Sequence, residues 1–130
     1  MIINLNNTRN EEVDEAINVE ELQKETMESM KEYISNLIPK LESMVIELKS
    51  DIKEDTWEYL RMMVDGFNWV LEAYNGTSTI INADKSIDES NVQKVVDELG
   101  EAFVKKNATQ TASSIENGVI PFLNEIIKRI

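Results

Sequence analysis

One stripe of apolar side chains constrains the fold of this 130-residue chain more than any other feature. Between residues 27 and 48, apolar residues recur at alternating steps of three and four positions, which places them on one face of an α-helix. Ile38, Val45 and Ile52 lie beside this stripe and widen it, as is typical of a bundle helix. Pro39 leaves the spacing in phase, so we expect a kinked but continuous helix. The stripe consists of Met27, Met30, Ile34, Leu37, Leu41, Met44 and Leu48.

A second stripe follows a polar turn at residues 53–56, and this short connection predicts a helix antiparallel to the first. The second stripe runs from Trp57 to Tyr74. Asn75-Gly76 then supplies residue types that tolerate the left-handed conformation at a helix end. Residues 26–76 are therefore predicted to form a first helical hairpin.

Another hairpin is predicted at residues 88–130, after a polar connection at residues 77–87. Ser86 and Glu89 have the spacing of a capping box, which marks a helix start. Two further apolar stripes lie on either side of a turn at residues 105–107, so this hairpin also contains two helices.

Residues 1–25 form an acidic N-terminal segment. Thr8 and Glu11 have capping-box spacing, which predicts a short helix from about Arg9 to Gln23. Its apolar residues are few, so we expect it to be loosely attached. The chain length suits one domain. The predicted fold is all-α, an antiparallel bundle of four main helices plus this short N-terminal helix.

The two predicted hairpins resemble each other in sequence. With an offset of 51 or 52 positions, residues 63–67 align with residues 115–119, and Val70-Leu71 aligns with Phe122-Leu123. This similarity indicates a duplicated hairpin, but amphipathic helices also match by chance, and both interpretations stay open.

Charge and missing residue types exclude several classes of function. The 25 acidic and 13 basic residues give a net charge of -12, which repels nucleic-acid phosphates and anionic lipids. The chain has no cysteine and no histidine, so it lacks thiol chemistry, the usual zinc ligand and the usual general base. It has neither a signal-peptide pattern nor an apolar run of the roughly 20 residues that span a bilayer. We expect a cytoplasmic protein with no nucleic-acid, membrane or small-molecule partner.

The segment 82–88 alternates oxygen-bearing side chains in the manner of a calcium loop. The match fails at the positions that matter, because fitting Ile87 to the hydrophobic position places Ile80 at the first acidic ligand and Lys85 at the turn glycine. The segment therefore indicates an ordinary loop followed by a helix N-cap. Carboxylate pairs on the helices indicate solvated surface, so we expect no metal, no cofactor, no catalytic residue and no enzymatic activity.

The helix predicted after residue 56 has a second apolar face. Either this helix lies at the centre of the bundle and buries both faces, with Gly66 permitting a close helix crossing, or the face is an exposed platform that binds a partner. Aromatic and Met side chains concentrate binding energy at protein interfaces. The partner would be a second copy of the chain or an amphipathic helix of another protein. The face consists of Tyr59, Met62, Gly66, Trp69 and Ala73.

Two short segments carry a resemblance to a known group of proteins. The segment Val64-Asp65-Gly66-Phe67-Asn68-Trp69-Val70, together with Val119-Ile120-Pro121-Phe122-Leu123, is similar to uncharacterised small helical-bundle proteins from Gram-positive Firmicutes. The resemblance covers about residues 26–130. It implies a helical bundle and implies no reaction, cofactor or catalytic residue.

These observations favour a non-enzymatic interaction module of the bacterial cytoplasm that binds a protein partner or itself through a helical face. One alternative is an export chaperone resembling the flagellar type, since those proteins are also small acidic helical bundles that bind amphipathic helices. Another is an acidic mimic of nucleic acid. That alternative rests on the net charge alone, and the 13 bases mixed among the acids weaken it.

Overall fold

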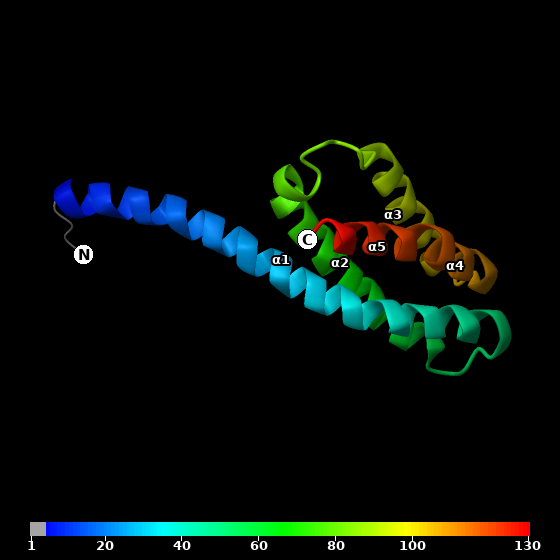
Figure 1. Ribbon diagram of the computed structural model, residues 1–130. Coiled ribbons are helices and arrows are strands. Elements are labelled where there is room, and N and C mark those ends of the chain that lie inside the picture. The colour runs from blue at the N-terminus through cyan, green and yellow to red at the C-terminus, as the bar shows by residue number, and fades with distance from the viewer. Residues whose placement is uncertain (1–4) are drawn as a thin grey trace.

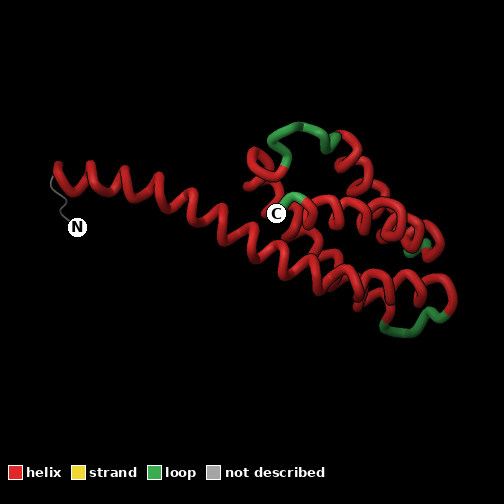
Figure 2. Tube along the Cα trace, in the orientation of Figure 1, coloured by secondary structure: helices red, strands yellow, loops and turns green. Residues whose placement is uncertain are grey.

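A computed structural model describes the backbone from Leu5 to Ile130 and the side chains from Val19 onward. The described part of the chain is helical and contains no strand, which confirms the predicted all-α bundle (Figures 1 and 2). No described helix has both the length and the apolar character that crossing a bilayer requires. The elements are α1 (Leu5–Ser50), α2 (Thr56–Ile81), α3 (Glu89–Val104), α4 (Ala108–Ser114), the π-helix η1 (Ile115–Val119) and α5 (Ile120–Lys128).

Helix α1 is longer than predicted. Its 46 residues run without a break through Pro39, so the short N-terminal helix predicted at residues 9–23 is not a separate element. The capping-box pattern at Thr8 does not mark a helix start, because α1 begins at Leu5. No glycine or proline lies between Leu5 and Pro39, and nothing in this stretch therefore ends the helix. The side chains of residues 5–18, including most of the predicted apolar set, lie outside the described residues.

Helix α2 also continues beyond its predicted end. Asn75-Gly76 lies inside the helix, and no described glycine has a positive φ. Thr77 is buried and its hydroxyl donates to the carbonyl of Ala73 at 2.7 Å, while Ile81 is buried in the core. Packing beyond the glycine therefore extends the helix, and the connection to α3 comprises residues 82–88 instead of the predicted 77–87.

The helix starts differ in detail from the predicted caps. At the α1–α2 turn, the side chain of Asp55 makes no capping hydrogen bond, and the buried hydroxyl of Thr56 accepts from the amide of Lys53 at 2.7 Å. Helix α3 is capped by Asp88, which accepts from the amide of Ser90 at 3.0 Å, so the predicted capping box of residues 86–89 is wrong.

Helix α1 contacts both its hairpin partner and the second hairpin. It packs against α2 on one side and against α4 and α5 on another, and α3 packs on α4 (Figure 1). Helix α2 packs against both α1 and α5, but Tyr59, Met62 and Trp69 stay exposed, so the interpretation that buried both of its apolar faces is wrong. The predicted stripes of α1 and of α4–α5 are buried, apart from the partly buried Met27. Ile52 lies after the end of α1 and is exposed, because the helix ends at Ser50.

The buried face of α2 is rotated relative to its predicted stripe. Val70 and Thr77 are buried, whereas Val64 and Leu71 are only partly buried. Phe67 and Tyr74 pack against Phe122 of α5 with near-perpendicular rings, and their centroid distances to Phe122 are 6.4 and 5.3 Å. These contacts join the two hairpins.

The fourth predicted helix is continuous but contains one π-helical turn, which the sequence pattern did not predict. Gly118 lies in this turn, where an added Cβ would come 3.1 Å from Val95 of α3. The offset between the two hairpin sequences aligns Gly66 with Gly118. Gly66 also lies against a side chain of a neighbouring helix, because an added Cβ there would overlap Tyr33 of α1. The hairpin duplication stays a prediction.

Candidate functional site

The α1–α2 hairpin has a covered face and an open face. On the covered face, Phe67 and Tyr74 of α2 are buried against α5. Four large apolar residues of the same helix stay exposed, and one of them, Ile80, lies near its C-terminal end. The other three belong to the predicted second apolar face: the exposed fractions of Tyr59, Met62 and Trp69 are 54, 68 and 41%. No described element covers these three side chains.

The five residues of the predicted second apolar face have three different environments. Tyr59, Met62 and Trp69 are exposed, Gly66 is partly buried, and Ala73 is buried. Of the two interpretations left open by the sequence, burial of the whole face at a bundle centre does not occur in the described structure. The exposed residues are the ones available to a partner.

Tyr33 of α1 completes this surface, and the sequence pattern did not identify it. Its ring lies edge-on to Trp69, with a centroid distance of 5.4 Å and an interplanar angle of 68°. A Cβ at Gly66 would overlap the Tyr33 hydroxyl, so the glycine provides the space in which this ring lies. We call Tyr33 and Trp69 the aromatic pair. A sequence signal for Tyr33 did exist, because it is a large aromatic residue that lies outside the core stripe of its own helix.

Two depressions flank the aromatic pair along the hairpin. The first has a volume of about 590 Å³, and its apolar lining includes Tyr33, Pro39 and Met62. The second has a volume of about 460 Å³, and its lining includes Leu22 and Trp69. Together with the aromatic pair, these depressions form what we call the hairpin groove. Its apolar lining is Val19, Leu22, Leu37, Pro39, Met44, Tyr59, Met62, Met63 and Ala73, with Tyr33 and Trp69 between the two depressions.

An acidic row borders the hairpin groove on α2. Glu58, Asp65 and Glu72 are the acidic residues of this helix, and all three are exposed. Their spacing of seven positions is almost two helical turns, so they lie in one line along α2. The row therefore places negative charge beside the exposed apolar residues.

A larger depression lies elsewhere, between α3 and the continuous rod formed by α4, η1 and α5. It has a volume of about 920 Å³ and a lining rich in polar residues, including Glu98, Glu101 and Asn117. The buried hydroxyl of Ser114, in the same lining, has no hydrogen-bond partner. The described residues contain no cluster of three or more side chains that could hold a metal ion. This depression offers few large apolar anchors, so we do not assign the binding surface to it.

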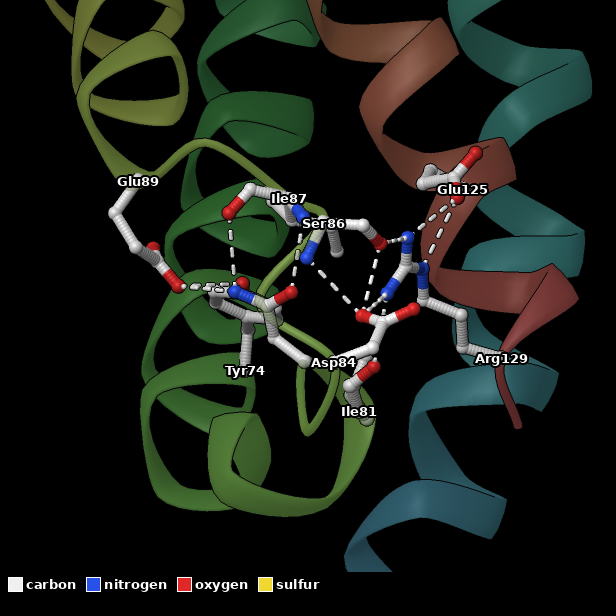
Figure 3. A network of polar contacts seen from close by, with 9 residues as sticks. Tyr74, Ile81, Asp84, Ser86, Ile87, Glu89, Glu125 and Arg129 are labelled. Carbon is white, nitrogen blue, oxygen red and sulfur yellow. Dashed lines mark hydrogen bonds and ion pairs between the residues drawn. The ribbon is translucent and has the colours of Figure 1, made fainter.

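The loop that resembles a calcium site is a structural clamp (Figure 3). Asp84 accepts hydrogen bonds from the amide and hydroxyl of Ser86, at 3.1 and 2.8 Å, and pairs with Arg129 of the C-terminal end at 3.0 Å. The hydrogen bonds from Ser86 and then from Arg129 lower the pKa of Asp84 to about 2. Arg129 also pairs with Glu125 at 2.9 Å and donates to the carbonyl of Ile81 at 3.3 Å.

A second set of contacts joins α2 to the start of α3. The side-chain amide of Asn82 donates to the carbonyl of Ile87 and to Glu89, both at 3.1 Å, and its oxygen accepts from the amide of Ile87 at 2.9 Å. Tyr74 donates to the same Glu89 carboxylate at 2.8 Å (Figure 3). Burial and this neighbouring carboxylate raise the pKa of Tyr74. The oxygens of the loop are thus used by donors of the protein itself.

The fold and the groove define a small α-helical bundle protein with an open apolar surface on its first hairpin. The chain belongs to the family described as a domain of unknown function, DUF8042, whose model matches residues 25–129. Both segments that carry the resemblance to small helical proteins lie inside this range. No curated protein and no solved structure matches the chain.

Proposed function

We propose that this protein is a non-enzymatic interaction module that binds a protein partner through the hairpin groove. The observation that carries the proposal is the alignment of Trp69, Met62 and Tyr59 on a face that no described element covers. A contiguous apolar patch of this kind commonly marks an interaction site on a soluble protein. A cytoplasmic location, an origin in a Firmicute bacterium and the lack of nucleic-acid or membrane partners belong to the same proposal, and the net charge of -12 supports the last of them.

The aromatic and Met residues in the groove lining are residue types that contribute much of the binding energy at protein interfaces. Trp and Tyr are enriched among the residues that dominate interface energetics, and Met adapts to irregular partner surfaces. The edge-to-face contact of the aromatic pair and the space above Gly66 hold both rings in place before a partner arrives. Such pre-organisation reduces the entropy lost on binding.

Replacing Trp69 and Met62 together by alanine is expected to weaken partner binding by at least about 100-fold, because each contributes roughly 2 kcal/mol or more when buried at an interface centre. The measurement compares proteins captured from bacterial lysate by the wild type and by the Trp69→Ala/Met62→Ala variant. Each captured candidate is then purified and its affinity is measured by calorimetry.

The matched control is Ile46→Ala/Val104→Ala, which removes two exposed apolar side chains outside the groove lining. The control is expected to retain every partner, and both variants are expected to stay folded, which a cooperative urea transition checks. Identical partners and affinities for the wild type and the groove variant would contradict the proposal. Binding that survives the groove substitutions but disappears in about 0.5 M salt would favour the nucleic-acid-mimic alternative.

Replacing Gly66 by alanine is expected to separate partner binding from stability. The new Cβ displaces the flexible end of Tyr33, which disrupts the aromatic pair, while alanine gains up to about 1 kcal/mol of helix propensity. We expect an unchanged or higher urea midpoint together with at least tenfold weaker partner binding. Gly100→Ala is the control, because a Cβ there meets no atom within 4 Å and gains the same propensity. Equal partner affinities of the two variants would reject the role given to the aromatic pair.

A further inference from the structure

The covered face of the α1–α2 hairpin already binds a helix. The α4–α5 rod packs along α1, and Phe122 inserts between Phe67 and Tyr74 of α2. The open face offers the same kind of surface, a groove between two packed helices. From Tyr59 to Gly76 the groove extends about 26 Å along α2, at about 1.5 Å per residue. This length matches a single helix of about 17 residues.

The acidic residues of the two hairpins differ in their partners. In the second hairpin, every acidic residue pairs with a lysine or arginine or accepts a hydrogen bond from a neighbouring side chain. These residues are Asp88, Glu89, Asp97, Glu98, Glu101, Glu116 and Glu125.

In the first hairpin, Glu47 and Asp51 lie within 3.9 and 3.7 Å of Lys53, but several exposed acids form no such pair. Among the described residues, the α2 row of Glu58, Asp65 and Glu72 has no lysine or arginine within ion-pair distance, and neither have Glu28 and Glu32 of α1. The apolar groove therefore runs beside carboxylates that form no ion pair in this structure, and the basic residues of the groove region include Lys40 in its lining and Arg61 on α2. An occupant that carries lysine or arginine next to an apolar face would complement it.

A second copy of the chain fits this surface poorly. A twofold dimer through the hairpin groove places the same patch of both copies face to face, which brings the two acidic rows together. Each copy has a net charge of -12, so this repulsion adds to the local one. Phosphate-rich partners are repelled for the same reason.

From the groove between two helices, its length and its acidic border that forms no ion pair, we infer that the hairpin groove binds a basic amphipathic helix of another protein. The helix has about four to five turns, large aliphatic residues on one face and lysine or arginine beside them. This inference rests on the proposed function and specifies its partner. The apolar face lies over the aromatic pair and Met62, and the basic residues lie beside Asp65 and Glu72.

The test uses three synthetic peptides of about 18 residues. The first is an amphipathic leucine–lysine helix, the second replaces each lysine by glutamate, and the third scrambles the first so that no apolar face forms. Fluorescence anisotropy is expected to give at least tenfold tighter binding of the first peptide than of either other peptide. The affinity is expected to fall as salt is raised, because the charge contacts are exposed.

Charge reversal tests the location of the contact. Asp65→Lys/Glu72→Lys is expected to weaken the leucine–lysine peptide at least tenfold and to improve the glutamate peptide. Glu42→Lys/Asp97→Lys makes the same change in net charge on exposed residues outside the groove lining, and is expected to change the affinity less than threefold. Equal weakening by both variants would show non-specific attraction and overturn the inference.

Three further outcomes would also overturn it. These are equal binding of the lysine and glutamate peptides, no binding of the lysine peptide at up to about 1 mM, and a wild-type dimer in sedimentation that Trp69→Ala/Met62→Ala converts to monomer. The proposed function fails separately, if the groove substitutions leave native partners bound. A native partner lost on groove substitution but insensitive to Asp65→Lys/Glu72→Lys would keep the function and reject the basic helix.

Discussion

Replacing Phe122 by alanine is expected to lower the free energy of unfolding by about 3–5 kcal/mol, because the substitution removes a buried aromatic side chain from the junction between the hairpins. Phe122 makes edge-to-face contacts with both Phe67 and Tyr74 of α2. Edge-to-face pairs add about 0.5–1.5 kcal/mol each beyond burial of area. Urea denaturation followed by circular dichroism would measure the change as a lower midpoint.

Two further variants make this measurement specific. Phe122→Leu keeps an apolar side chain at the site and is expected to lose less than Phe122→Ala, because a smaller cavity remains. Asn124→Ala changes an exposed residue of α5 and is expected to stay within about 0.5 kcal/mol of the wild type. A loss below about 1 kcal/mol for Phe122→Ala would mean that α5 does not pack on α2 as described.

Replacing Asn82 by alanine is expected to cost about 2–3 kcal/mol, a large effect for a loop residue. Asn82 is buried, and its side chain satisfies both the amide and the carbonyl of Ile87 while also donating to Glu89. Without it, these groups lose their partners, and a buried unsatisfied polar group costs about 1–3 kcal/mol. The urea midpoint would measure the loss, and faster hydrogen exchange at the Ile87 amide would locate it.

The matched control is Asn75→Ala, an exposed position in the preceding helix α2, which is expected to be neutral or slightly stabilising. Asn82 lies outside the lining of the hairpin groove, so folded Asn82→Ala protein is expected to bind partners with wild-type affinity. Unchanged stability of Asn82→Ala would show that the Asn82 contacts do not hold the loop. A loss of partner affinity in the folded variant would show that the loop and the groove are coupled.

The spacing of apolar residues was sufficient to predict the helices and most of the core. The stripe from Met30 to Leu48 is buried, and so is the stripe from Ala112 to Ile126. These predictions succeed because helical periodicity is local, and a helix with one apolar face has only one way to bury it.

The residues near the helix ends did not by themselves determine where the helices end. Asn75-Gly76 has the residue types of a helix end, yet α2 continues to Ile81 because Thr77 and Ile81 are buried against the rest of the bundle. In α1 the short N-terminal helix and the main helix are one element, since no residue between them breaks the helix. The π-helical turn near Gly118 also had no sequence signal that we recognised.

The sequence by itself identified the second apolar face of α2, because its residues share one helical spacing. Whether that face is buried or exposed depends on which neighbour covers it, and the packing of α5 on Phe67 and Tyr74 leaves Met62 and Trp69 uncovered. Tyr33 joins the surface only through the register of α1 against α2, which places its ring over Gly66. Such a register is set by the fit of two helix surfaces to each other, so tertiary structure alone decided it.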